Sequence, residues 1–141
     1  MIRYQAKIYK DEDSYSVEFP DLPGCFSMGD SFEEACQMAR EALSLYLDEA
    51  RDPKWHVPKA KTRKGKNYHW IAPDESVTIA LMIRQARLKK GLSQNKMAKL
   101  LGKSVQQLQK LEMPGKSNPT IKTLAKISKV LDAKLDVSFL F

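Results

Sequence analysis

LSQNKMAKLLGKSVQQLQKLE, residues 92–112, is the stretch that decides the fold of the second half of this chain. Ala98 is small enough to let two helices cross closely, and Gly102 can take the left-handed conformation that a tight turn requires. Ser93 and Ser104 are typical helix N-caps. Apolar residues that could lock two helices together recur at helical spacing: Met97, Leu101, Leu108 and Leu111. The stretch therefore predicts a helix-turn-helix, whose second helix can present its first side chains to the major groove of DNA.

The same stretch resembles the Cro/repressor-like (XRE) family of bacterial regulators. Lys116-Ser117-Asn118-Pro119-Thr120, followed by an apolar helix, extends the resemblance, which covers about residues 78–138. The resemblance implies a set of DNA-binding residues: Gln94, Ser104, Val105, Gln106, Gln107, Gln109, Lys110, Lys116 and Asn118. Gln can pair with adenine, Lys can reach guanine, and Val can contact the thymine methyl group.

Charge is divided unevenly along the chain. Residues 1–53 hold 5 Lys and Arg against 12 Asp and Glu, a net charge of −7, whereas residues 54–141 hold 19 against 5, a net charge of +14. The basic part suits nucleic acid, because Lys and Arg displace its counterions, and the acidic part favours a basic partner. The asymmetry predicts two domains, residues 1–71 with a basic linker within about residues 52–67, and residues 76–141. A helical bundle with a solvated basic surface and no role in DNA binding is the alternative interpretation.

The first half of the chain has the alternation that is typical of half-buried strands. Apolar and polar residues alternate over residues 2–9 and 15–19, and a polar turn between them predicts an antiparallel hairpin. A third short strand is expected near residues 25–28. Ser31 and Glu34 then predict a capping box for a helix whose apolar stripe ends at Ala50.

The remaining elements complete an α+β fold. Tyr68–Ile71 predicts a fourth strand that closes the sheet. N-caps, glycines and apolar spacing predict four helices, at about residues 77–90, 94–101, 105–112 and 121–131. Alternation at Leu135–Phe139 predicts a last strand. We therefore expect a small antiparallel sheet packed by a helix (β-β-β-α-β), followed by an all-α helix-turn-helix domain with a short C-terminal strand.

Three motifs of the first half, YSVEFPDLPGCF from Tyr15, GDSFEEA from Gly29 and AREAL from Ala39, resemble the HicB antitoxin family over about residues 2–71. That resemblance implies a partial RNase H-like fold without nuclease activity. It also implies a partner, the small basic HicA toxin, which is a ribonuclease with a fold like that of double-stranded-RNA-binding domains. An antitoxin domain followed by a helix-turn-helix implies a type II antitoxin that neutralises an mRNA-cleaving toxin and represses its own operon.

Toxin contacts are expected around the hairpin and the bend after it. The candidate residues are Asp11, Glu12, Asp13, Tyr15, Phe19 and Asp21. For Tyr15 and Phe19 a place in the core is the competing interpretation, and the acidic turn could serve solubility alone.

Catalytic chemistry lacks its residues here. Two-metal hydrolysis needs converging carboxylates, and the predicted strands offer mainly Glu18. Cys25, Cys36, His56 and His69 lack the short paired spacing of a zinc site, and nothing orients Cys25 as a nucleophile. We therefore expect no enzyme activity, no cofactor and no metal. The alternative function is a stand-alone transcriptional regulator with an N-terminal sensor or dimerisation domain.

Location and assembly follow from weaker signals. The chain has no apolar run near the ~20 residues of a membrane span, and no apolar signal segment, so a cytoplasmic protein is expected. A helix-turn-helix that reads the two halves of a double-stranded operator implies a homodimer or a higher even oligomer. The predicted strand Leu135–Phe139 is a candidate dimer element, because an unpaired apolar edge seeks a partner, and packing within its own domain is the alternative.

Overall fold

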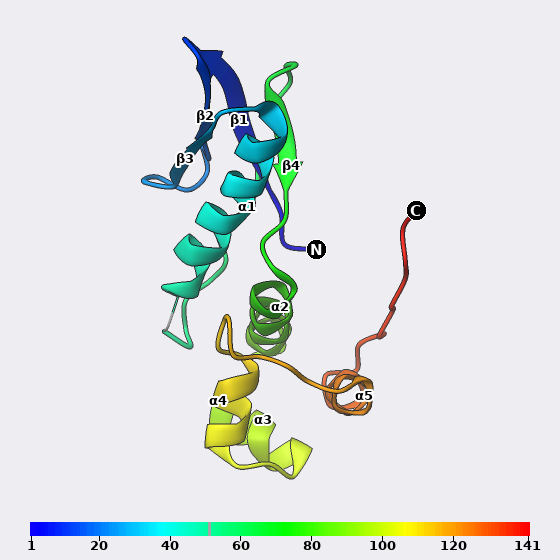
Figure 1. Ribbon diagram of the computed structural model, residues 1–141. Coiled ribbons are helices and arrows are strands. Elements are labelled where there is room, and N and C mark those ends of the chain that lie inside the picture. Colours follow the sequence, from blue (N-terminus) through cyan, green and yellow to red (C-terminus); the bar gives the residue numbers. More distant parts are fainter. Residues whose placement is uncertain (51) are drawn as a thin grey trace.

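The computed structural model describes residues 1–50 and 52–141 (Figure 1). Its elements are, in order, β1 (Tyr4–Asp11), β2 (Ser14–Glu18), β3 (Phe26–Gly29), α1 (Phe32–Asp48), β4 (Tyr68–Ile71), α2 (Glu75–Lys89), α3 (Gln94–Leu101), α4 (Val105–Leu111) and α5 (Ile121–Val130). The predicted α+β fold is confirmed, with an antiparallel sheet and a helix followed by four helices.

The sheet has the strand order β3-β2-β1-β4, and every neighbouring pair is antiparallel. The hairpin turn lies at Glu12 and Asp13, between the paired residues Asp11 and Ser14. Helix α1 packs against one face of this sheet (Figure 1). The apolar positions of the strands and of α1 meet there in one buried cluster, which includes Tyr4, Ile8, Val17, Phe19, Leu43 and Leu47.

The start of α1 is held tightly against the end of β3. Ser31 caps the helix as predicted, because its hydroxyl accepts a hydrogen bond from the Glu34 N–H at 3.1 Å. The Glu34 carboxylate accepts from the Asp30 N–H at 2.6 Å, one residue earlier than a standard capping box has it. A Cβ at Gly29 would lie 2.5 Å from the Ala35 nitrogen, so only glycine allows β3 to end this close to the helix.

The basic linker is tied to the sheet along its length, although residues 52–66 contain no helix or strand. The Tyr4 hydroxyl donates to the Pro58 carbonyl at 2.7 Å. The side-chain amide of Gln5 exchanges hydrogen bonds with the main chain of Arg63. The Arg63 guanidinium then pairs with the Asp21 carboxylate at 2.8 Å, which holds the pKa of Asp21 below its usual value. The composition alone predicted a mobile segment, and it did not reveal these partners in the sheet.

Helix α2 belongs to both halves of the molecule, and it lies between them in Figure 1. Val77 and Leu81 pack into the cluster beneath the sheet, whereas Ile83 packs into the cluster of the C-terminal helices. The buried Arg84 guanidinium donates to the Ala50 carbonyl at 2.8 Å and to the Glu112 carbonyl at 2.8 Å. This one side chain therefore joins the end of α1 to the end of α4, and its burial lowers its pKa.

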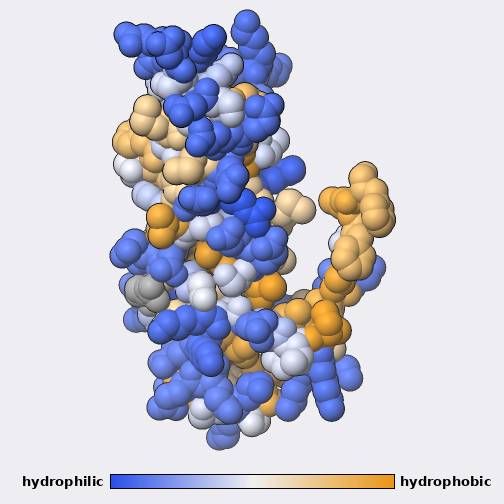
Figure 2. Space-filling view, in the orientation of Figure 1, coloured by the Kyte–Doolittle hydropathy of each residue, from blue (hydrophilic) through white to orange (hydrophobic). Residues whose placement is uncertain are grey.

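The predicted strand Leu135–Phe139 is wrong for the single chain. Residues 132–141 form neither helix nor strand and are exposed. A strand is held by hydrogen bonds to a neighbouring strand, and no described strand of the chain reaches this segment. Figures 1 and 2 show the segment standing away from the body, with a mostly hydrophobic surface, so packing within its own domain is also excluded for the single chain.

Candidate nucleic-acid interface

Helices α3 and α4 form the predicted helix-turn-helix. Met97, Ala98, Leu101 and Leu108 are all buried where the two helices pack, together with residues of α2 and α5. The turn between the helices contains Gly102, whose φ of +67° is the left-handed conformation expected from the sequence. The predicted apolar anchors and the turn glycine are therefore confirmed.

Helix α4 begins with a complete capping box. The Ser104 hydroxyl accepts from the Gln107 N–H at 3.1 Å, and the Gln107 side-chain oxygen accepts from the Ser104 N–H at 2.9 Å. Sequence reasoning found the cap but missed the return bond, although the Ser-x-x-Gln spacing carries the signal. The first turn of α4 is thus fixed, and the Gln107 oxygen is already engaged.

The outer face of α4 presents polar side chains to solvent. Gln106, Gln107, Gln109 and Lys110 are exposed, and Val105 is half-buried. Leu108 faces inward and anchors the helix. A helix with one buried anchor and a row of exposed amides has the form that a major groove can accept.

A chain of hydrogen bonds runs from the interior to this face. Arg87, on α2, pairs through its guanidinium with both carboxylate oxygens of Glu112, the Nη2–Oε2 distance being 3.0 Å. Glu112 Oε2 accepts from the Gln94 amide at 2.9 Å, and the Gln94 oxygen lies 3.5 Å from Gln109 Nε2. Two of the predicted DNA-binding residues, Gln94 and Gln109, are thereby brought together and oriented by a buried ion pair. The sequence analysis did not single out Arg87 or Glu112.

The remaining two predicted contacts lie in the loop between α4 and α5. Lys116 and Asn118 are exposed, and with Asp74 and Glu75, at the start of α2, they line an open groove of about 450 Å³. They are therefore not part of the α4 face itself, and acidic residues lie beside them.

The surface around the helix-turn-helix is basic. Glu112 is the only carboxylate in the sequence between Gly91 and Leu131, and it is buried. Exposed lysines occur on all three helices of this part: Lys96, Lys99, Lys110, Lys122, Lys126 and Lys129. Such a surface attracts a polyanion.

The six candidate toxin contacts do not form one surface. Asp11, Glu12 and Asp13 are exposed together at the hairpin turn, whereas Phe19 is a core residue and has no surface to offer a partner. The other two have partners within the chain: the Tyr15 ring packs edge-on against Phe32, and the Asp21 carboxylate binds Arg63.

The larger acidic surface of the N-terminal part is the outer face of α1. Its exposed residues are Glu33, Glu34, Glu41 and Glu49, together with the apolar Met38 and Leu45. The helical repeat of the apolar stripe already implied that these residues face outward.

Features that would support other chemistry are weak. Burial raises the pKa of the Cys25 thiol to about 11, which disfavours a thiolate nucleophile. Among the described residues, no group of three His, Cys, Asp or Glu side chains is placed to hold a metal ion. Over those same residues, no helix has the length and apolar character needed to cross a membrane.

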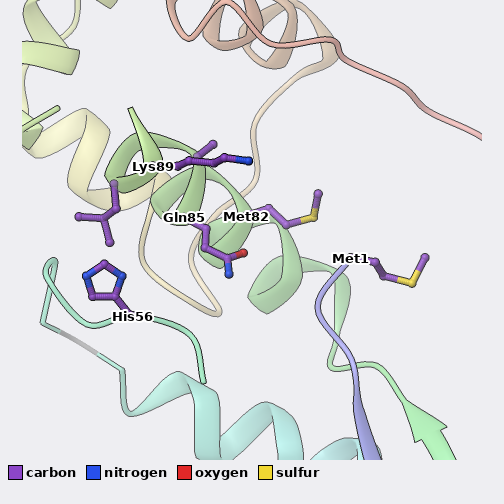
Figure 3. Close-up of a pocket in the computed structure, with 7 residues that line it drawn as sticks. Met1, His56, Met82, Gln85 and Lys89 are labelled. Atoms are coloured by element: carbon purple, nitrogen blue, oxygen red, sulfur yellow. The ribbon is translucent and has the colours of Figure 1, made fainter. Parts of the chain in front are cut away.

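A groove of about 530 Å³ lies beside α2 and is lined by Met1, His56, Met82, Gln85 and Lys89, among others. Figure 3 shows the side chains of Gln85 and Lys89 pointing in different directions, and His56 coming from the opposite wall. The polar groups do not converge on one point, as they would in a small-molecule sensor site.

Comparison with known proteins gave matches to both parts. The sequence model of a family described as a HicB-like antitoxin of bacterial toxin–antitoxin systems matches residues 4–90, and one described as helix-turn-helix matches residues 83–137. "Antitoxin HicB 2" of Photorhabdus laumondii is 30% identical over 110 residues, which are 78% of this chain and 77% of that protein. "Antitoxin HicB" of Escherichia coli K12 is 26% identical over 100 residues, 71% and 72% of the two chains. A chain of a solved HicA3 and HicB3 toxin–antitoxin complex matches with a TM-score of 0.41 and 19% identity, over 52% of this chain and 99% of that one.

Proposed function

Because this chain belongs to the HicB-like antitoxin family of bacterial toxin–antitoxin systems, we propose that it binds and neutralises a HicA-like, mRNA-cleaving toxin and represses its own operon through the helix-turn-helix. The observation that carries the proposal is the union, in one chain, of the antitoxin-family match with an exposed recognition helix on a basic surface. In this proposal the protein is a regulator and not an enzyme.

Operator binding is assigned to α4 and its neighbours. Val105, Gln106, Gln109 and Lys110 would read base edges, and the free NH₂ group of Gln107 would add a donor. Gln94 and Ser104, at the starts of α3 and α4, would lie against phosphates, and Lys116 and Asn118 would hold the backbone further along. Glu112 supports this arrangement because it fixes the amide of Gln94.

The DNA-binding part is tested by titrating the promoter of the chain's own operon with the purified protein. Gln106→Ala should weaken operator binding by about 1–3 kcal/mol and relax sequence preference at one base pair. Gln37→Ala, at an exposed glutamine of α1, is the matched control and should bind like the native protein. Equal affinities for the two variants would remove Gln106 from the interface.

Toxin binding is assigned to the acidic surface of the N-terminal part. The hairpin residues Asp11, Glu12 and Asp13 remain candidates, and their exposure and charge favour a basic partner. Tyr15 could contribute its exposed edge, and Asp21 only by leaving Arg63. Phe19 is left out because it lies in the core.

The toxin-binding part is tested by co-expressing the tagged chain with its neighbouring genes and identifying what co-purifies stoichiometrically. A small basic protein whose ribonuclease activity is silent in the complex would support the proposal. Lysine at positions 11, 12 and 13 should then weaken the complex, and Glu41→Lys, on α1, shows whether the hairpin or the helix is the main contact. A chain that purifies alone yet binds its own promoter would refute the antitoxin role and leave the DNA-binding role intact.

A further inference from the structure

Residues 134–141, which we name the apolar arm, are an exposed segment with an alternating pattern. Leu135, Val137, Phe139 and Phe141 alternate with Lys134, Asp136, Ser138 and Leu140. Phe139 is 86% exposed and Val137 is 61% exposed. The last main-chain hydrogen bond before the arm joins the Ala133 N–H to the Ser128 carbonyl, at the end of α5.

The arm has the sequence of a strand with one apolar face, and it lacks only a neighbour. An extended apolar segment with unpaired N–H and C=O groups is a template for pairing with another chain. Both Phe rings would otherwise stay in water, which is costly because a buried aromatic ring removes about 150–250 Å² from solvent. No described strand of the same chain lies beside the arm.

We propose that the apolar arm pairs, as an antiparallel strand, with the apolar arm of a second copy of this chain, and so joins two helix-turn-helix units. Antiparallel pairing of one segment with itself is what a two-fold axis produces, because each copy offers the same surface to the other. The requirement for a second copy rests on the proposed operator binding, since a helix-turn-helix dimer reads half-sites about one helical turn apart.

The exposed area of the arm is large enough for such an interface. Its five apolar side chains, Leu135, Val137, Phe139, Leu140 and Phe141, together expose roughly 700 Å² per copy, taking about 150–200 Å² for each whole side chain. If the second copy covers them, roughly 1,400 Å² is buried in total, which lies within the about 1,200–2,000 Å² of stable interfaces. A small ligand could not cover this area, and a second copy brings an equal apolar surface of its own.

The test is sedimentation equilibrium of the full chain without DNA, over a series of concentrations. The native protein should be a dimer, and Phe139→Glu should raise the dimer dissociation constant about a hundredfold or more, because each dimer loses two aromatic anchors. Ser138→Glu adds the same charge on the opposite side of the strand and should leave the dimer nearly intact.

Thermal melting separates this effect from misfolding. The arm does not pack on its own body, so Phe139→Glu should keep the melting temperature that the monomer has, and Val137→Lys should repeat its effect on the dimer. A native chain that is monomeric, a Phe139→Glu variant that dimerises like the native protein, or a Ser138→Glu variant that dissociates equally would each overturn the inference.

The outcome is distinguishable from failure of the proposed function. A dimer that dissociates on Phe139→Glu but binds neither toxin nor operator would leave this inference standing and remove the function. A monomer that binds both would remove the inference alone.

Discussion

Arg87→Met is expected to lower the free energy of unfolding by about 3–5 kcal/mol, because it leaves a buried carboxylate without its main partner. The Arg87 and Glu112 side chains are 4% and 1% exposed. Besides the carboxylate, Arg87 donates to the Leu92 carbonyl at 2.8 Å and the Pro53 carbonyl at 2.9 Å, and these acceptors would also lose a donor. Glu112 would keep only the Gln94 amide and the charge of Arg84 nearby.

This loss is a large part of the stability of a small domain, which is typically about 5–15 kcal/mol. Urea denaturation at pH 7, followed by circular dichroism, should show a midpoint lowered by about 2 M, given a slope of about 1–3 kcal/mol/M. Arg40→Met is the matched control. Arg40 forms equally short bonds with Asp74 and Glu75, but all three side chains are exposed, so its removal should cost less than about 1 kcal/mol.

The double variant Arg87→Met/Glu112→Met tests the cause. If the cost comes from an unpaired buried charge, removing the carboxylate as well should recover much of it, because apolar residues often replace a buried ion pair without loss. The reasoning would be refuted if Arg87→Met cost no more than Arg40→Met, or if the double variant were less stable than Arg87→Met.

Three further changes have defined outcomes. The pKa of Asp21 is lowered, chiefly by its hydrogen bond from Arg63, so its stabilising effect is present above the ordinary Asp pKa of about 3.9 and is lost as pH falls through the lower folded-state value. Asp21→Asn should therefore destabilise the protein at pH 7 in urea titrations, with a difference that shrinks in acid; a difference that grew in acid would contradict this. In a Cys36→Ser background, Cys25 should react with a maleimide at pH 7 only as the protein unfolds, because the thiol is buried and its pKa is raised to about 11; fast labelling of the folded protein would speak against burial. Gly102→Val should lower the stability of the helix-turn-helix by about 1–2 kcal/mol in thermal melts, because φ is +67° there, and an unchanged melt would show that the turn can relax.

The helix-turn-helix could be predicted in detail because its signals are local. Ala98, Gly102 and the caps at Ser93 and Ser104 act within a turn or two of helix, so their spacing in the sequence is their spacing in space. The same holds for the strands, whose alternation has a period of two, and for the cap of α1 at Ser31. The toxin-contact candidates were less secure, since a period of two cannot tell whether Phe19 packs inward or serves a partner.

By itself, therefore, the sequence determined the order of the elements, the apolar faces of strands and helices, the α4 residues available to DNA and the opposite charges of the two halves. Only the tertiary structure decided that Arg84 and Arg87 lie buried across the junction, that Gln94 is held by Glu112, that Asp21 binds the linker, and that Leu135–Phe139 has no strand beside it. The physical reason is that periodicity reports which side of an element faces a core, whereas the partner of a charge or of a strand edge comes from residues distant in sequence, and packing of the whole chain brings them together.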